Sequence, residues 1–209
     1  MTPLRIEHYV VGPVQTNCYL VINEETREVL VVDPGAEGKR LAGIIKEEGL
    51  KPVCVLLTHG HFDHAGAAAE LAEYFQIKIY AHRTEKETLE NPQLNLSIWE
   101  GRETIYHADV YVTDGQELDL AGFHIRVLST PGHTVGGCCY LFPYQNVLFA
   151  GDTLFAQSVG RTDFPKGSAS QLIRSIKEKI MTLPDEITVY TGHNEITTIG
   201  TERMYNPYL

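Results

Sequence analysis

The sequence predicts a layered α/β fold, and three observations support this class. Apolar residues alternate at strand spacing near the N-terminus, and helical and strand patterns then follow one another by turns. The chain has 209 residues, of which 43% are hydrophobic, and this is enough to bury the core of one domain. We therefore predict a single domain over residues 1–209.

Strands are predicted first where apolar and polar residues alternate, at residues 9–11, 17–23 and 28–33. Four later strands are short apolar runs that lead into glycine and a histidine or aspartate. These runs begin at Val53, Val127, Val147 and Ile187. Continuous apolar runs of this length are typical of strands that are buried on both faces.

Helices are predicted where apolar residues recur at a spacing of three or four. Residues 38–48 carry Leu41, Ile44 and Ile45 in this pattern, and the alanine-rich residues 65–75 begin just behind a histidine-rich loop. Residues 171–181 repeat the pattern, and Pro184 follows where a helix usually stops. Residues 195–209 are expected to form about one helical turn.

Metal-binding residue types gather between Thr58 and Gly66, where the chain reads T-H-G-H-F-D-H-A-G. Imidazole and carboxylate are the donors that suit Zn²⁺, Fe²⁺ and Mn²⁺. A polar surface turn is the competing interpretation. The position directly after a buried strand, where α/β folds place their sites, favours a metal site instead. The four residues are His59, His61, Asp63 and His64.

Three further strand ends pass the same test, because each places a ligand-type residue beside glycine after an apolar run. They supply His133, Asp152 and His193. We predict that His59, His61 and His133 hold one ion, that Asp63, His64 and His193 hold a second, and that Asp152 bridges them. Each ion would keep an open position for a shared hydroxide, which is typical of a catalytic site.

These motifs resemble those of the metallo-β-lactamase-fold hydrolases, and within them the hydroxyacylglutathione hydrolase (glyoxalase II) branch and its small bacterial YcbL-type members. The resemblance covers nearly the whole chain. It rests on T-N-C-Y-L-V at 16–21, V-D-P-G at 32–35, T-H-G-H-F-D-H at 58–64, T-P-G-H-T at 130–134, G-D-T-L-F at 151–155, G-R-T-D-F at 160–164 and G-H at 192–193. It implies an αββα sandwich of two mixed β-sheets flanked by helices, with the site along one edge.

The resemblance also implies the reaction. It indicates a binuclear hydrolase of thioesters, S-D-lactoylglutathione or a related hydroxyacyl thioester, with two divalent ions, zinc first and iron or manganese as alternatives. The bridging hydroxide would attack the thioester while Asp152 holds the two ions together. Asp63 would orient the hydroxide or accept its proton. Only sixteen residues follow His193. We therefore expect no C-terminal helical glutathione-binding domain.

Two segments are candidates for contact with the substrate. Arg161 follows the bridging ligand closely enough to reach a carboxylate, although an ion pair with Asp163 is an equal alternative. Asn95 lies in a polar connection between predicted helices. Asp33 in D-P-G is interpreted first as a turn former, and support of a metal ligand is the alternative.

Three other functions compete with thioester hydrolysis. A persulfide dioxygenase of the same fold would use a single Fe²⁺ on His59, His61 and His133 with Asp152. A β-lactamase is disfavoured because those enzymes are exported and usually lack an aspartate at the bridging position. A metal-bound interaction module is disfavoured because it has no need for an open site.

Composition limits the partners and the location. The net charge of −10 argues against nucleic acid, which needs a lysine and arginine footprint. No apolar stretch is long enough for a membrane span and no leader pattern begins the chain, so we expect a cytoplasmic protein with a small-molecule thioester as its partner. Cys18, Cys54, Cys138 and Cys139 are expected to be free and buried. The sequence leaves the oligomeric state open.

Overall fold

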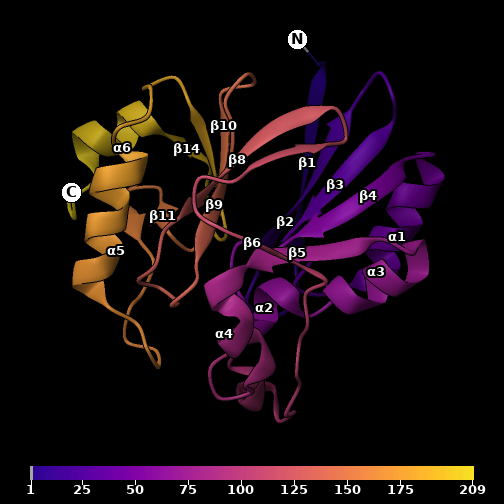
Figure 1. The fold of residues 1–209 in the computed structure, drawn as a ribbon, viewed down its shortest axis with the longest axis horizontal. Helices are drawn as coiled ribbons and strands as arrows, with labels where there is room; N and C mark the ends of the chain where they lie inside the picture. The colour runs from indigo at the N-terminus through magenta and orange to yellow at the C-terminus, as the bar shows by residue number, and fades with distance from the viewer. Residues whose placement is uncertain (1) are drawn as a thin grey trace.

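The protein, described here by a computed structural model for residues 2–209, is built from two six-stranded β-sheets that pack face to face. Helices cover the outer face of each sheet, α1 and α3 on one side and α5 and α6 on the other (Figure 1). This arrangement confirms the predicted αββα sandwich.

The first sheet has the order β1-β2-β3-β4-β5-β6, antiparallel from β1 to β3 and parallel from β3 to β6. Its strands are Leu4–Val11, Thr16–Asn23, Glu28–Val32, Lys51–Leu56, Lys78–His82 and Val110–Val112. The helices associated with this half are α1 Gly38–Glu47, α2 Phe62–Ala65, α3 Ala68–Phe75 and α4 Lys86–Glu90, with 3₁₀ turns at Arg83–Glu85 and Ser97–Glu100.

The second sheet has the order β14-β13-β10-β9-β8-β7 and is antiparallel except for the pair β10 and β13. In chain order its strands are β7 Glu117–Leu120, β8 Phe123–Ser129, β9 Cys138–Phe142, β10 Val147–Gly151, β13 Thr188–Thr191 and β14 Thr197–Thr198. A small hairpin, β11 Leu154–Phe155 with β12 Ser158–Val159, lies outside it. Its helices are α5 Ala169–Ser175, which continues as a π-helical turn over Ile176–Ile180, and α6 Ile199–Tyr205.

Three apolar layers hold the sandwich together, and the alternation of side chains along each strand assigns residues to them. Tyr19 and Val21 of β2 face the second sheet, whereas Leu20 and Ile22 face α1 and α3. Cys138 and Cys139 likewise point to opposite layers, and all four cysteines are free and buried, as predicted. Because both faces of these strands are covered, their sequences read as continuous apolar runs.

The helix predicted over residues 65–75 is broken at Gly66 and Ala67, so that the metal-loop residues form the separate short helix α2. The break lets α2 lie directly on the Pro34–Gly35 turn. A Cβ on Gly35 would stand 1.4 Å from the Asp63 carbonyl oxygen, and one on Gly66 would stand 2.2 Å from the Gly35 carbonyl oxygen. Only glycine permits this approach at either position.

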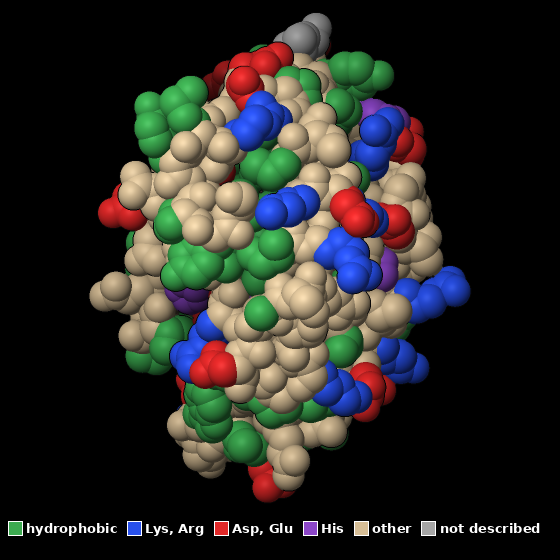
Figure 2. Space-filling model, turned by 90° about the vertical axis from the view of Figure 1, so that its left-hand side faces the viewer, with side chains coloured by type: hydrophobic (Ala, Val, Ile, Leu, Met, Phe, Trp, Pro, Cys, Tyr) green, Lys and Arg blue, Asp and Glu red, His purple; other side chains and the backbone are tan. Residues whose placement is uncertain are grey.

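The surface over α5 and α6 carries lysine, arginine, aspartate and glutamate side chains interspersed with apolar ones (Figure 2). This face therefore presents no continuous basic surface. Within residues 2–209, no helix has the length and apolar character that a membrane crossing requires.

The contact between Gly35 and α2 predicts an asymmetric response to two glycine substitutions. Gly35→Ala should destabilise the fold by about 1–3 kcal/mol or more, because the methyl group meets backbone rather than a movable side chain. Gly43→Ala in α1 is the matched control, since a Cβ there meets nothing within 4 Å and should stabilise the helix by roughly 0.5–1 kcal/mol. Urea unfolding of both variants measures the difference, and equal stabilities would contradict the close packing of α2.

Candidate metal centre

All seven predicted ligands come together at one edge of the sandwich, and they come from both sheets. The first sheet supplies the turn after β4 and the helix α2, and the second supplies the turns after β8, β10 and β13. The residues are His59, His61, Asp63 and His64 from the first half and His133, Asp152 and His193 from the second. Their role as ligands remains a prediction that this convergence supports.

The first group is formed by three buried histidines. His61 Nδ1 lies 3.1 Å from His59 Nε2 and 3.0 Å from His133 Nε2, so three ring nitrogens face a common point. The rings meet nearly at right angles, with centroids 4.7–4.8 Å apart. This is the disposition that a three-histidine site needs.

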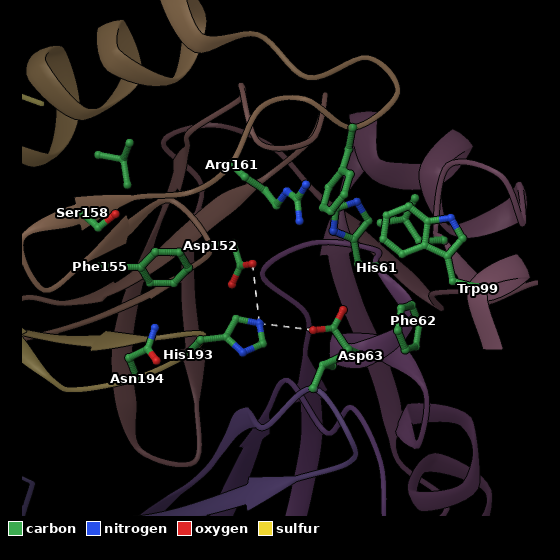
Figure 3. Close-up of a pocket in the computed structure, with 14 residues that line it drawn as sticks. His61, Phe62, Asp63, Trp99, Asp152, Phe155, Ser158, Arg161, His193 and Asn194 are labelled. Atoms are coloured by element: carbon green, nitrogen blue, oxygen red, sulfur yellow. Dashed lines mark ion pairs between the residues drawn. The ribbon is translucent and has the colours of Figure 1, made fainter.

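The second group combines two histidines with a carboxylate. His193 Nε2 lies 3.2 Å from Asp63 Oδ2 (Figure 3). His64 Nε2 lies 3.5 Å from the same oxygen. Asp152 stands between the two groups. One of its oxygens is 3.3 Å from His64 Nε2, and the other is 3.5 Å from His133 Nε2.

The residues fit a metal ion on two independent grounds. His64 Nε2 and Asp152 Oδ1 are buried and have no hydrogen-bond partner among residues 2–209, and unpaired buried polar atoms are costly unless an ion satisfies them. In addition, outer acceptors hold the opposite nitrogens of three histidines. The bonds run from His64 Nδ1 to Asp33, from His133 Nδ1 to the Arg161 carbonyl, and from His193 Nδ1 to the Gln15 carbonyl. This anchoring is typical of metal-binding histidines.

The two groups differ in their protonation. Burial, together with the neighbouring imidazoles, lowers the pKa of His59 far below its usual value and that of His61 to about 3. Burial also lowers the pKa of His64 and His193, but the carboxylates of Asp63 and Asp152 outweigh it and raise both values. Burial therefore keeps His59 and His61 neutral, whereas at His64 and His193 protons compete more strongly with an ion for the ring nitrogens.

Two residues support the predicted ligands. Asp33 turns the chain with a φ of 51°, as a turn former does. It is also buried and accepts hydrogen bonds from Thr58 N at 2.8 Å, Thr58 Oγ1 at 2.6 Å and His64 Nδ1 at 3.0 Å. Thr16 Oγ1 donates to Asp63 Oδ2 at 2.9 Å. Both residues lie in motifs of the resemblance, which was the only signal available.

Glu85 is a third supporting residue, and nothing in the sequence pointed to it. Its side chain is fully buried behind the first group. Gly60 N, between two of the histidines, donates to Oε1 at 2.9 Å, and Thr134 Oγ1, beside His133, donates to Oε2 at 3.0 Å. Burial raises the pKa of Glu85, and these donors partly oppose that shift. One carboxylate thus ties the two histidine loops together.

A cleft of about 380 Å³ opens onto the second group, and Asp152 and His61 also line it. Arg161 pairs with Asp163 through two hydrogen bonds of 2.8 and 2.7 Å, which confirms the ion-pair interpretation. It also lines the cleft, and its contact with a substrate carboxylate stays a prediction. Asn95 is not brought into the cleft. It is fully buried, its amide donates to the carbonyls of Leu89 and Thr104, and its role here is to hold the loop.

Comparison with protein families and curated proteins identifies clear relatives. The model of the metallo-beta-lactamase superfamily matches residues 11–193. A probable metallo-hydrolase of Bacillus subtilis, YqgX, is 41% identical over 95% of this chain and 94% of its own. The hydroxyacylglutathione hydrolase GloC of Haemophilus influenzae is 37% identical over 99% of this chain and 98% of its own.

Three solved structures share the fold over nearly the whole chain. BLEG-1, a B3 metallo-beta-lactamase, is 40% identical with a TM-score of 0.93 over 98% of this chain and 99% of that one. TTHA1623, in a di-iron-bound form, is 35% identical with a TM-score of 0.87 over 97% of this chain and 100% of that one. ETHE1 from Myxococcus xanthus is 31% identical with a TM-score of 0.82 over 97% of this chain and 83% of that one.

The opposite pKa shifts predict that the two groups lose metal at different pH. Acidification should release the ion held by Asp63, His64 and His193 first, because the raised pKa values of the two histidines let protons compete as the pH falls. His59 and His61 stay neutral over that range. Zinc per chain after dialysis at pH 8, 7 and 6 measures the order. Simultaneous loss of both ions would contradict it.

The position of Glu85 predicts a graded loss of metal affinity at the first group. Glu85→Ala leaves Gly60 N and Thr134 Oγ1 unpaired, and zinc affinity should fall about 10- to 100-fold, as for other outer-shell partners. Glu85→Gln keeps an acceptor and a donor and should lose less. Competition with a zinc chelator measures both variants, with Glu87→Ala on the exposed side of the same segment as the control. Unchanged affinity in Glu85→Ala would show that the loops hold their positions without it.

Proposed function

The chain belongs to the metallo-beta-lactamase superfamily of metal-dependent hydrolases, and from this premise we propose that it hydrolyses thioesters with two bound divalent ions. S-D-lactoylglutathione or a related hydroxyacyl thioester is the substrate class, and zinc is the first choice of metal, with iron or manganese as alternatives. The free buried thiols fit a reducing compartment, so we also propose a cytoplasmic location.

The position of Asp152 carries this proposal. Its two carboxylate oxygens face different groups, one toward His64 and the other toward His133, and His193 Nε2 is 3.7 Å from the second oxygen. A carboxylate between two sets of donors suits a pair of ions better than a single one. The di-iron form of TTHA1623, which is 35% identical, supports the same interpretation.

When bound, two such ions supply a water of lowered pKa and a Lewis acid for the carbonyl of the substrate. Asp152 and the histidines would hold them. Asp63 faces the cleft, and a hydrogen bond from Thr16 fixes one of its oxygens, so it is placed to orient a water molecule by accepting a hydrogen bond from it. Its pKa, raised by burial but lowered more strongly by His64 and His193, is about 2, which keeps the carboxylate ionised.

A thioester suits this residue set because a thiolate leaves without strong acid catalysis. Apart from the predicted ligands, none of the described side chains that line the cleft is a carboxylic acid or an imidazole that could protonate a leaving group. The relative GloC, named as a hydroxyacylglutathione hydrolase, supports the same class. Arg161 faces the cleft and is the proposed contact for a substrate carboxylate.

Two other reactions receive support from particular relatives. The likeness to ETHE1 supports persulfide oxidation by a single iron on the first group, although the complete second group argues for two ions. The likeness to BLEG-1 supports β-lactam hydrolysis. Both reactions therefore belong in the same experiment.

We expect zinc-loaded protein to hydrolyse S-D-lactoylglutathione and to contain about two ions per chain. Asp152→Ala should lose more than about 100-fold in rate and should also lose metal, since even outer-shell changes cost about 10–100-fold. Asp119→Ala, on an exposed strand of the second sheet, is the control and should match the parent protein.

Parallel assays separate the alternatives. Oxygen uptake on glutathione persulfide with about one iron per chain would replace hydrolysis by oxidation, and faster turnover of a chromogenic cephalosporin would make the protein a β-lactamase. Full activity of Asp152→Ala with two ions bound would refute the role given to that residue.

A further inference from the structure

The cleft beside the metal centre has two chemically different walls. On one side lie Phe155, Ser158 and Asn194, which mix apolar and polar groups (Figure 3). The opposite wall is entirely apolar, and we call it the tryptophan wall. It consists of Phe62, Leu96, Trp99 and Phe164.

Aromatic contacts connect the tryptophan wall to the metal centre. Trp99 meets Phe164 edge to face with ring centroids 5.1 Å apart, and Phe164 meets the ring of His61 in the same way at 5.5 Å. The Arg161 guanidinium lies over the Phe164 ring, 4.1 Å from its centroid. A group bound at the wall would therefore lie directly beside the reacting carbonyl.

Trp99 is the exposed member of this wall, with 60% of its surface accessible, whereas Leu96 and Phe62 are buried at its base. The loop that carries Trp99 is anchored. The Asn95 amide donates to the Leu89 and Thr104 carbonyls, and its oxygen accepts from Ser97 N. An exposed indole on an anchored loop is a preformed contact surface, and aromatic side chains of this kind dominate recognition.

The small number of charged residues in the cleft also favours an apolar ligand group. Apart from the predicted ligands, Arg161 is the one charged residue among the described side chains that line the cleft, and Asp163 already pairs with it. A glutathione group carries two carboxylates and an ammonium group. Among the described lining side chains, the single guanidinium of Arg161 is the one group that a substrate carboxylate can contact, whereas the tryptophan wall offers an apolar group a continuous surface.

We propose that the tryptophan wall is a specificity subsite for an apolar substituent of the substrate, either an aromatic ring or a branched aliphatic group. This inference rests on the proposed function for the reaction and adds the part of the thioester that the enzyme selects. The substituent belongs either to the acyl group or to the thiol, and the two sides of the thioester are tested separately.

Matched substrate pairs test the subsite. Acetyl and phenylacetyl thioesters of N-acetylcysteamine vary the acyl side, and S-methyl and S-benzyl thioacetates vary the thiol side. We expect kcat/KM to be at least about 10-fold higher for the apolar member of one pair, as for other hydrophobic pockets. Trp99→Ala should abolish this preference, and Trp99→Phe should keep most of it.

Tyr144→Ala provides the matched control, because Tyr144 is an aromatic residue with the same 60% exposure outside the cleft. It should keep the full preference. Equal kcat/KM within both pairs, or a preference that survives in Trp99→Ala, would overturn the proposal.

Binding is measured separately from catalysis, because Trp99 is the only tryptophan in the chain. Titration of the zinc-loaded protein with S-benzyl-N-acetylcysteine, a thioether that cannot be hydrolysed, should change the tryptophan emission in a saturable way. S-methyl-N-acetylcysteine should require at least about 10-fold higher concentrations. Equal titration by both thioethers, or no response to either, would overturn the subsite. If no thioester is hydrolysed, the proposed function fails, and the emission titration alone decides the subsite.

Discussion

The site depends on the hydrogen bonds that meet at Thr58, where the two sheets join. Its amide and hydroxyl both donate to Asp33 at the end of β3, and its carbonyl accepts from Cys138 N at 2.9 Å, at the start of β9. The end of β10 packs against the same side chain, since a Cβ on Gly151 would stand 2.2 Å from Thr58 Oγ1. Asp33 also accepts a hydrogen bond from His64 Nδ1 and thereby fixes the orientation of that ring. The first metal loop is therefore positioned by bonds to both sheets before any ion is present, which lowers the cost of assembling the ligands.

A second set of bonds does the same for the other side of the centre. Asn17 N donates to the Gly192 carbonyl at 2.8 Å, and the Tyr19 hydroxyl donates to the Thr191 carbonyl at 2.7 Å, so β2 of the first sheet holds the His193 turn of the second. The apolar layer between the sheets sets their separation, and these polar bonds at its rim set the register of the ligands. Packing and positioning are thus carried by different residues.

Strand and ligand positions could be predicted because their signals are local. The run that ends in Thr58 and the three glycine-flanked turns identify, by residue type and spacing alone, the seven residues that converge in the structure and are the predicted ligands. Residues that act across the fold could not be found in this way. Glu85 accepts hydrogen bonds from two loops that lie far from it in sequence. The residues next to it in the sequence carry no pattern that predicts a buried carboxylate. Asn95 has the sequence setting of a polar loop residue, but its amide donates its hydrogen bonds to backbone carbonyls and does not face the cleft. The break between α2 and α3 follows from the contact of Gly66 with Gly35, and helical spacing carries no information about that contact.

The two halves of the centre come from distant parts of the chain, since His59 precedes His193 by 134 positions. During synthesis, the first half of the ligand set leaves the ribosome well before the second. No emerging chain can complete either three-residue group until β8 or β13 has been made and docked. Loading with metal is therefore a late event in the life of the molecule.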